Sequence, residues 1–314
     1  MILRSTATPP SPVPSVIVHS NATELPVVRT YDVTGLHGWL ATKLDPVRTA
    51  DEPPTGDKAI DDAHENARVT LDFFRQVLGR NSIDGKGSPV VNFVHDEITP
   101  MNATWSSGAM TYGDGDGRLF GPMSGALDVV AHEMSHGVVE HTAGLQYQGQ
   151  PGALNESFAD VFGEIAQQWH EDPAGFGTVD AARGAEWLIG EDAVLPAFGG
   201  AAMRNMARPG TAFKNDTFGA DPQVGSMHDF VRTSADFGGV HTNSGIPNRA
   251  AYEAAIQIGS EKVAKIWYDA LGSLTPRATF SDAAHAIVAS AGKLYDSGVS
   301  SAVADAWKAV EVLD

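Results

Sequence analysis

The stretch Asp128-Val-Val-Ala-His-Glu-Met-Ser-His136, followed by Gly152-Ala-Leu-Asn-Glu-Ser-Phe-Ala-Asp160, organises this sequence. Its first part contains the pattern H-E-x-x-H. Two imidazoles four residues apart on a helix lie on one face, so His132 and His136 can bind the same zinc ion. Glu133 is placed to approach a water at that metal without binding the metal itself.

The pattern H-E-x-x-H alone also occurs by chance, as two surface histidines on an amphipathic helix. A catalytic zinc ion needs a third protein ligand and an open fourth position. Glu156 supplies a candidate third ligand, and Asp160, four residues later, shares its helix face. Asp160 is predicted to accept the second N–H of a ligating histidine. The two motifs together favour a catalytic zinc site over a surface pair.

At this point the chain resembles the thermolysin family of zinc metallopeptidases, from about Tyr31 to the C-terminus. The stretches that carry the resemblance are Asn102-Ala-Thr-Trp105, Tyr112-Gly-Asp-Gly-Asp-Gly117, Val129 to His136, Thr142-Ala-Gly-Leu-Gln-Tyr147, Gly152 to Glu156 and Gly238-Gly-Val-His-Thr-Asn-Ser-Gly245. The run Gly245-Ile-Pro-Asn-Arg249 and the compact length are similar to the shorter, protealysin-like branch.

The resemblance implies an α+β fold, a two-domain zincin with the zinc helix at the domain junction. We expect a flexible Pro-rich lead at 1–30, a β-rich N-terminal catalytic domain at 31–141 and a helical C-terminal domain at 142–314.

Residue patterns predict the elements themselves. Strands are expected within 31–43 and at 90–94 and 109–112, and the zinc helix from about Ser124 to Glu140. The other predicted helices are 58–78, 154–169, 226–234, 245–258, 260–272, 280–296 and 300–312. Residues 173–184 and 198–202 are predicted to be loops.

The resemblance also assigns catalytic roles. Glu133 would be the general base that later returns its proton to the leaving amine. His241 and Tyr147 match the positions that stabilise the oxyanion, and Asp236 matches the acid that orients His241.

Substrate contacts follow from the same resemblance. Asn102 and the carbonyl of Ala103 would hold the peptide at a strand edge, and Arg204 would bind its backbone. The pocket after the cleaved bond resembles six apolar residues: Phe120, Met123, Val129, Ile189, Ala193 and Met203. Cleavage is therefore expected on the N-terminal side of bulky hydrophobic residues.

Calcium is expected to be weakly bound or absent. The family's double site matches Asp128, Glu186 and Glu191, but two of its acids are replaced by Gln167 and Leu188. Calcium prefers six to eight oxygen ligands, so this loss weakens the site. The run Asp114 to Gly117 lacks the EF-hand spacing and is predicted to be a tight turn.

The net charge of −18 excludes nucleic acid and anionic membranes as expected partners, leaving peptide and protein substrates. The absence of cysteine excludes disulfides and cysteine nucleophiles. We expect a monomer. The family points to secretion, but no signal peptide is visible at the N-terminus, so a cytoplasmic location stays open.

Two alternative functions remain. A zinc aminopeptidase would share H-E-x-x-H and a distant glutamate, but it would need acidic groups that capture a free α-amine, and no such motif is evident. A catalytically weak, zinc-dependent binding relative would be expected to lack the base or an oxyanion donor. Glu133, Tyr147 and His241 are all present.

Overall fold

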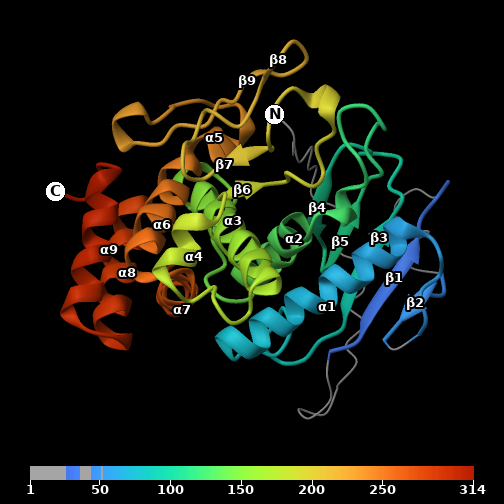
Figure 1. Ribbon diagram of the computed structural model, residues 1–314, viewed down its shortest axis with the longest axis horizontal. Coiled ribbons are helices and arrows are strands. Elements are labelled where there is room, and N and C mark those ends of the chain that lie inside the picture. The colour runs from blue at the N-terminus through green and yellow to red at the C-terminus, as the bar shows by residue number, and fades with distance from the viewer. Residues whose placement is uncertain (1–25, 36–43, 51) are drawn as a thin grey trace.

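The structure is a computed structural model that describes residues 26–35, 44–50 and 52–314 (Figure 1). Most of the expected N-terminal lead and the segment 36–43 of the expected first strand lie outside the described residues.

A mixed five-stranded sheet forms the N-terminal part (Figure 1). Its strands are β1 (Val28–Asp32), β2 (Arg48–Thr49), β3 (Val90–Val94), β4 (Ala103–Ser106) and β5 (Ala109–Tyr112), in the order β2-β1-β3-β5-β4. Strands β1, β3 and β5 are parallel, while β2 and β4 are antiparallel to their neighbours. Because β1 begins at Val28, the prediction of a lead reaching residue 30 was too long.

Helix α1 (Lys58–Leu78) covers one face of this sheet, with the predicted bounds. Asp57 caps its N-terminus by accepting the backbone N–H groups of Ala59 and Ile60. Gly79 ends the helix in the left-handed conformation, at φ 67°, which glycine adopts without steric cost.

Two helices, α2 (Leu127–Glu140) and α3 (Gly149–Glu171), lie at the centre of the molecule (Figure 1). They approach each other closely at Gly163, where an added Cβ would lie 2.7 Å from the carbonyl oxygen of Asp128. The backbones of α2 and α3 are thus in direct contact near the proposed zinc ligands.

The C-terminal part is helical. It contains α6 (Gly245–Ile258), α7 (Ser260–Leu271), α8 (Phe280–Leu294) and α9 (Ser297–Ala309). Helices α8 and α9 lie at the end of the molecule opposite the sheet (Figure 1). Trp267 and Trp307 are buried among these helices. The predicted α+β fold is therefore confirmed, and no helix in the described ranges is both long and apolar enough to cross a membrane.

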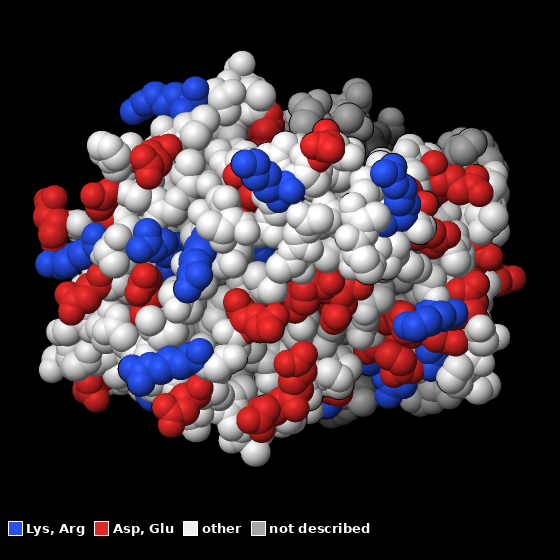
Figure 2. Space-filling model, turned by 45° about the horizontal axis from the view of Figure 1, so that its top comes forward, with Lys and Arg blue, Asp and Glu red and all other residues white. Residues whose placement is uncertain are grey.

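Short elements connect the centre to the surface. Strand β6 (Leu188–Ile189) pairs antiparallel with β7 (Arg204–Asn205), and β8 (Lys214–Asn215) pairs with β9 (Gly219–Ala220). Helix α5 (Asp236–Asn243) precedes α6. Figure 2 shows one face of the molecule, on which acidic residues are widely spread and Lys and Arg lie among them.

Two element predictions were wrong. The segment 226–234 forms only a short 3-10 helix, Met227–Asp229, because most of it is exposed and its packing against the core comes from Met227 and Phe230, too little for a longer amphipathic helix. Residues 173–184 are not all loop, because Val179–Gly184 forms α4. Thr178 caps α4 by accepting the backbone N–H of Ala181, and Ala182 is buried.

Candidate active site

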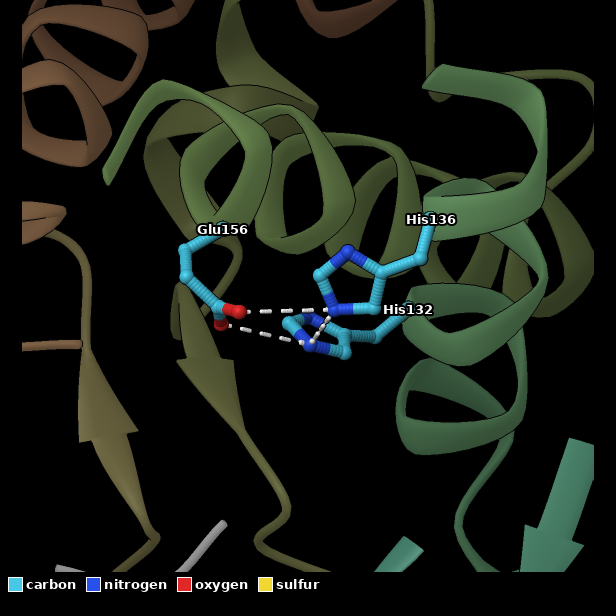
Figure 3. A group of neighbouring side chains, drawn as sticks. All are labelled: His132, His136 and Glu156. Carbon is cyan, nitrogen blue, oxygen red and sulfur yellow. Dashed lines mark hydrogen bonds and ion pairs between the residues drawn. The ribbon is translucent and has the colours of Figure 1, made fainter. Parts of the chain in front are cut away.

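Two histidines of α2 and one glutamate of α3 converge on a single point (Figure 3). The Nε2 atoms of His132 and His136 are 3.0 Å apart. Glu156 places one carboxylate oxygen 3.6 Å from His132 Nε2 and the other 3.5 Å from His136 Nε2. Among the described residues, this is the group of His, Asp or Glu side chains whose ligand atoms are close enough to hold a metal ion.

The outer nitrogen of each ring is already engaged. His132 Nδ1 lies 2.8 Å from Asp160 Oδ1, and His136 Nδ1 lies 2.7 Å from Asn155 Oδ1. Because these oxygens accept, each Nδ1 carries the proton and each Nε2 presents a lone pair to the centre of the site. Two nitrogen lone pairs that face each other beside a carboxylate repel one another. A cation bound between them would attract all three groups.

The residues present therefore fit a metal ion. Tetrahedral zinc with Zn–N distances near 2.0–2.1 Å places two nitrogen ligands about 3.3 Å apart, close to the spacing seen here. Oε2 of Glu156 is buried and has no hydrogen-bond partner among the described residues. Such an oxygen is costly to bury unless something binds it, and a metal ion would do so.

Charge around Glu156 keeps it ionised. Burial opposes the charged carboxylate, but the charges that His241, His136 and His132 carry when protonated outweigh that effect and lower its pKa to about 2. Burial likewise opposes a charge on His132, while the hydrogen bond with Asp160 raises the His132 pKa. The same bond makes the imidazole a stronger ligand.

Asp160 is fully buried and accepts from every side. Arg204 donates from Nε at 2.9 Å and from Nη2 at 2.6 Å, and Asn248 Nδ2 donates at 2.8 Å. Although burial opposes ionisation, Arg204 and His132 hold the pKa of Asp160 well below its usual range. Arg204 itself is buried, so the structure gives it a supporting contact to Asp160 that the sequence did not reveal.

Glu133 lies on α2 directly after the first ligand and is almost fully buried. Tyr112, at the end of β5, lies near it: burial and then the charge of Glu133 raise the pKa of the Tyr112 hydroxyl. That hydroxyl has no hydrogen-bond partner among the described residues. Sequence reasoning gave Tyr112 no role, and its orphaned hydroxyl has no signature in the sequence.

Tyr147 and His241 both lie next to the carboxylate of Glu156. The Tyr147 hydroxyl donates to Glu156 and lies 3.3 Å from His241 Nε2. Asp236 accepts both the ring Nδ1 of His241, at 2.7 Å, and its backbone N–H, at 2.9 Å. The structure thus brings together all four residues for which catalytic or orienting roles were predicted: Glu133, Tyr147, Asp236 and His241 near Glu156.

The predicted peptide-binding edge is a true sheet edge. Strand β4 is the last strand of its sheet, and Ala103 is its first residue. Asn102, just before it, is buried, and its side-chain Oδ1 has no hydrogen-bond partner among the described residues.

Backbone hydrogen bonds connect the segments that carry four of the six predicted pocket residues, Phe120, Ile189, Ala193 and Met203. Gly121 N donates to the carbonyl of Ala193, and Met203 N donates to that of Ile189. All six are buried, and only Val129 and Met203 retain any exposure, at 3% and 4%. Phe120 packs against Phe198, with the two ring centroids 5.1 Å apart.

Asp128, Glu186 and Glu191 do not form a group of ligand atoms close enough together to hold a metal ion, within the described residues. Burial and then the charge of Asp128 raise the pKa of Glu191 to about 8. Asp128 is buried and accepts the backbone N–H groups of Val129 and Gly190. The Gln167 amide donates to Glu191 at 2.8 Å, which puts a donor where a cation would need an acceptor. Glu186 is exposed. Gln167 Oε1 and Glu191 Oε2 are buried without a hydrogen-bond partner among the described residues, so weak or absent calcium binding stays a prediction.

The fold and the site define a class of protein: a metallohydrolase with two histidines and one glutamate on adjacent helices and a histidine–tyrosine pair beside them. The family model of the thermolysin metallopeptidase catalytic domain matches residues 20–140, and that of the thermolysin metallopeptidase alpha-helical domain matches residues 143–312. The chain belongs to the thermolysin family of metallopeptidases.

Individual relatives agree. The extracellular metalloprotease of Pectobacterium carotovorum subsp. carotovorum is 42% identical over 271 residues, which are 85% of this chain and 76% of that protein. Protease PrtS of Photorhabdus sp. (strain Az29) is 41% identical over 273 residues, covering 85% and 72%. The precursor of protealysin, a metalloproteinase from Serratia proteamaculans, matches in structure with a TM-score of 0.86 at 40% identity, covering 94% of this chain and 90% of that one.

Proposed function

We propose that this metallopeptidase is a zinc endopeptidase that hydrolyses peptide bonds on the N-terminal side of bulky hydrophobic residues. The observation that carries the proposal is the meeting of His132, His136 and Glu156 with the Tyr147–His241 pair around one point. Three protein ligands of this kind leave a fourth position open, as catalytic zinc sites do. Zinc bound there would act as a Lewis acid toward water and the substrate carbonyl.

Glu133 would serve as the proton carrier. Its position next to His132 on α2 lets its carboxylate reach the attacking water while His132, His136 and Glu156 hold the metal. Glu133 takes the proton as water attacks the carbonyl carbon, and it delivers that proton to the leaving amine as the peptide C–N bond breaks. General catalysis of this kind contributes about 10²–10⁴-fold to the rate.

Tyr147 and His241 would stabilise the charge that develops on the carbonyl oxygen. With Nδ1–H of His241 donated to Asp236, a proton on Nε2 gives a charged donor directed at the same point as the Tyr147 hydroxyl. Asn102 and Ala103 at the edge of β4 would align the peptide, and Arg204 would contact its backbone from beside the site.

The apolar pocket would set the specificity. A charged side chain entering it would be desolvated without a partner, whereas Leu, Phe or Met would bury its full apolar area, worth roughly 1.5–3 kcal/mol. Ala193 and the deformable Met123 and Met203 leave room for Phe as well as Leu. We further propose that the enzyme is a monomer that acts outside the cell. The names of its relatives, extracellular metalloprotease and extracellular elastase, support the extracellular location.

The test uses N-terminally blocked peptides. Zinc-loaded protein is expected to cleave them, to lose activity with a chelator and to regain it with zinc, while Glu133→Gln keeps its zinc and loses most turnover. Cut sites in a mixed peptide library should precede bulky apolar residues. Cleavage only of peptides with a free α-amine would favour an aminopeptidase, and full activity of Glu133→Gln would reject the mechanism.

A further inference from the structure

The first half of α5 has an unusual backbone. Four consecutive residues lie in the left-handed region: Asp236 at φ 51°, Phe237 at 49°, Gly238 at 89° and Gly239 at 76°. Glycine adopts this region freely. For other L-residues the left-handed conformation costs roughly 1–2 kcal/mol. Asp236 has a short polar side chain that can offset this cost by local hydrogen bonding, but Phe237 does not. Phe237 is thus a strained residue within the active-site wall.

Strain of this kind persists only where the surroundings fix it. The left-handed turn is pressed against the segment that follows Tyr147, since an added Cβ on Gly238 would lie 3.0 Å from the backbone nitrogen of Gly149. In the same place the ring of Phe237 packs edge-on against the ring of Tyr147, with centroids 5.5 Å apart and an interplanar angle of 66°.

The two segments that meet here each supply one of the proposed oxyanion donors. Tyr147 lies just before α3, and His241 lies on α5, where Asp236 of the left-handed turn holds it at both its ring and its backbone. The rings of Tyr147 and His241 are 6.4 Å apart and steeply inclined. Phe237 therefore contacts one donor with its side chain and is joined through its backbone to the residue that fixes the other.

We propose that Phe237 is a positioning residue that sets the Tyr147 hydroxyl beside His241 Nε2, an inference that rests on the proposed peptidase function. The left-handed turn aims the ring of Phe237 at Tyr147, and the edge-on contact stops the phenol from turning away from the oxyanion position. The backbone strain is retained because a residue better suited to this backbone, such as glycine or asparagine, has no ring to offer.

Substitutions that suit the backbone but lack the ring separate strain from positioning. Phe237→Asn and Phe237→Gly both fit a left-handed residue, so the zinc-loaded variants are expected to melt at or above the temperature of the parent protein. Their kcat on a blocked peptide should nevertheless fall about 10–100-fold with little change in KM, since a small displacement of a transition-state donor is costly. Phe237→Tyr keeps the ring and should restore most of the kcat.

A matched control is available on the sheet. Phe93 packs against Tyr31 at the same centroid distance of 5.5 Å, away from the metal-ligand group. Phe93→Asn is expected to lower the melting temperature and leave kcat unchanged. A peptide analogue with a tetrahedral phosphonate in place of the scissile carbonyl should lose affinity for Phe237→Asn in proportion to the loss of kcat/KM, and zinc content should stay the same.

Several results would overturn the inference. One is a kcat for both ring-free variants within about twofold of the parent value; another is equal loss of kcat in Phe237→Tyr. A lower melting temperature accompanying the lost kcat would assign Phe237 to packing alone. Should the parent protein hydrolyse no blocked peptide, the peptidase proposal fails, and the Tyr147–His241 distance in a crystal structure of Phe237→Asn would still decide whether Phe237 positions the pair.

Discussion

Asp160→Asn tests how much the hydrogen bonds of Asp160, which does not itself bind the metal, contribute to stability and to zinc binding. The carboxylate of Asp160 accepts from Arg204 Nε, Arg204 Nη2, Asn248 Nδ2 and His132 Nδ1. An ionised carboxylate offers about four acceptor sites, so this residue is saturated. Asparagine has a single acceptor oxygen and adds an NH₂ group that faces other donors.

The expected loss follows from burial. Asp160 has no exposed surface, and the side chain of Arg204 is 7% exposed. Removing the negative charge leaves a buried guanidinium without its counter-charge, which costs about 3–5 kcal/mol of unfolding free energy. The imidazole of His132 also loses the acceptor that fixes its ring, and zinc affinity is expected to fall about 10–100-fold.

The assay is urea unfolding of the metal-free protein, combined with chelator competition for zinc. The metal-free measurement reports the loss of all the contacts of Asp160, with Arg204 the charged one among them, and the competition reports the effect on zinc binding through His132. Asp269→Asn is the control, because Asp269 pairs with exposed Lys293 at 2.7 Å and should cost no more than about 1 kcal/mol. The reasoning is refuted if Asp160→Asn costs no more than this control and binds zinc as the parent does.

Three further predictions address other groups. His241→Ala should lower kcat about 10²–10³-fold with little effect on KM, measured on a blocked peptide, and a pure KM effect would instead make His241 a substrate contact. Selective calcium chelation with zinc retained should shift the melting temperature by less than about 3 °C, because two acids of the expected calcium site are replaced by Gln167 and Leu188; a much larger drop would show a strong calcium site. Burial opposes a charge on His95, but its hydrogen bond and charge interaction with Asp114, followed by Asp57 and Asp32, raise its pKa above 6.5. The resulting stability is full below the unfolded-state value of 6.5 and is lost as pH rises through the higher folded-state pKa, so the destabilisation caused by His95→Gln should shrink as pH rises above 6.5 in urea titrations; an effect independent of pH would contradict this.

The sequence predicted best those features that depend on neighbours in the chain. The bounds of α1 were right because Asp57, the spaced apolar residues and Gly79 act locally. The metal-ligand group was predictable for the same reason, since His132 and His136 are one helical turn apart. The missed helix α4 is short and gains its stability from a cap and one buried alanine, which leaves little periodic signal.

Contacts between distant segments could not be read from the sequence. The pairing of Arg204 with Asp160 depends on the β6–β7 pair lying against α3, and Arg204 was predicted to hold substrate rather than Asp160. The left-handed turn at Phe237 contradicts the local preference of phenylalanine, so propensity would argue against it. Strain of that kind arises only from the packing of the complete fold.

The close approach of α2 and α3 limits which residues this chain can accept at the point where the two helices touch. Gly163 has no side chain that could bind a metal or substrate and takes part in no chemistry. A single methyl group there would meet the carbonyl of Asp128 at 2.7 Å, and backbone cannot yield as a flexible side chain does. The helices would have to separate, and Glu156 would move with α3 away from the histidines of α2. Position 163 should therefore be as intolerant of exchange in a mutational scan as the ligands themselves, with alanine already inactivating.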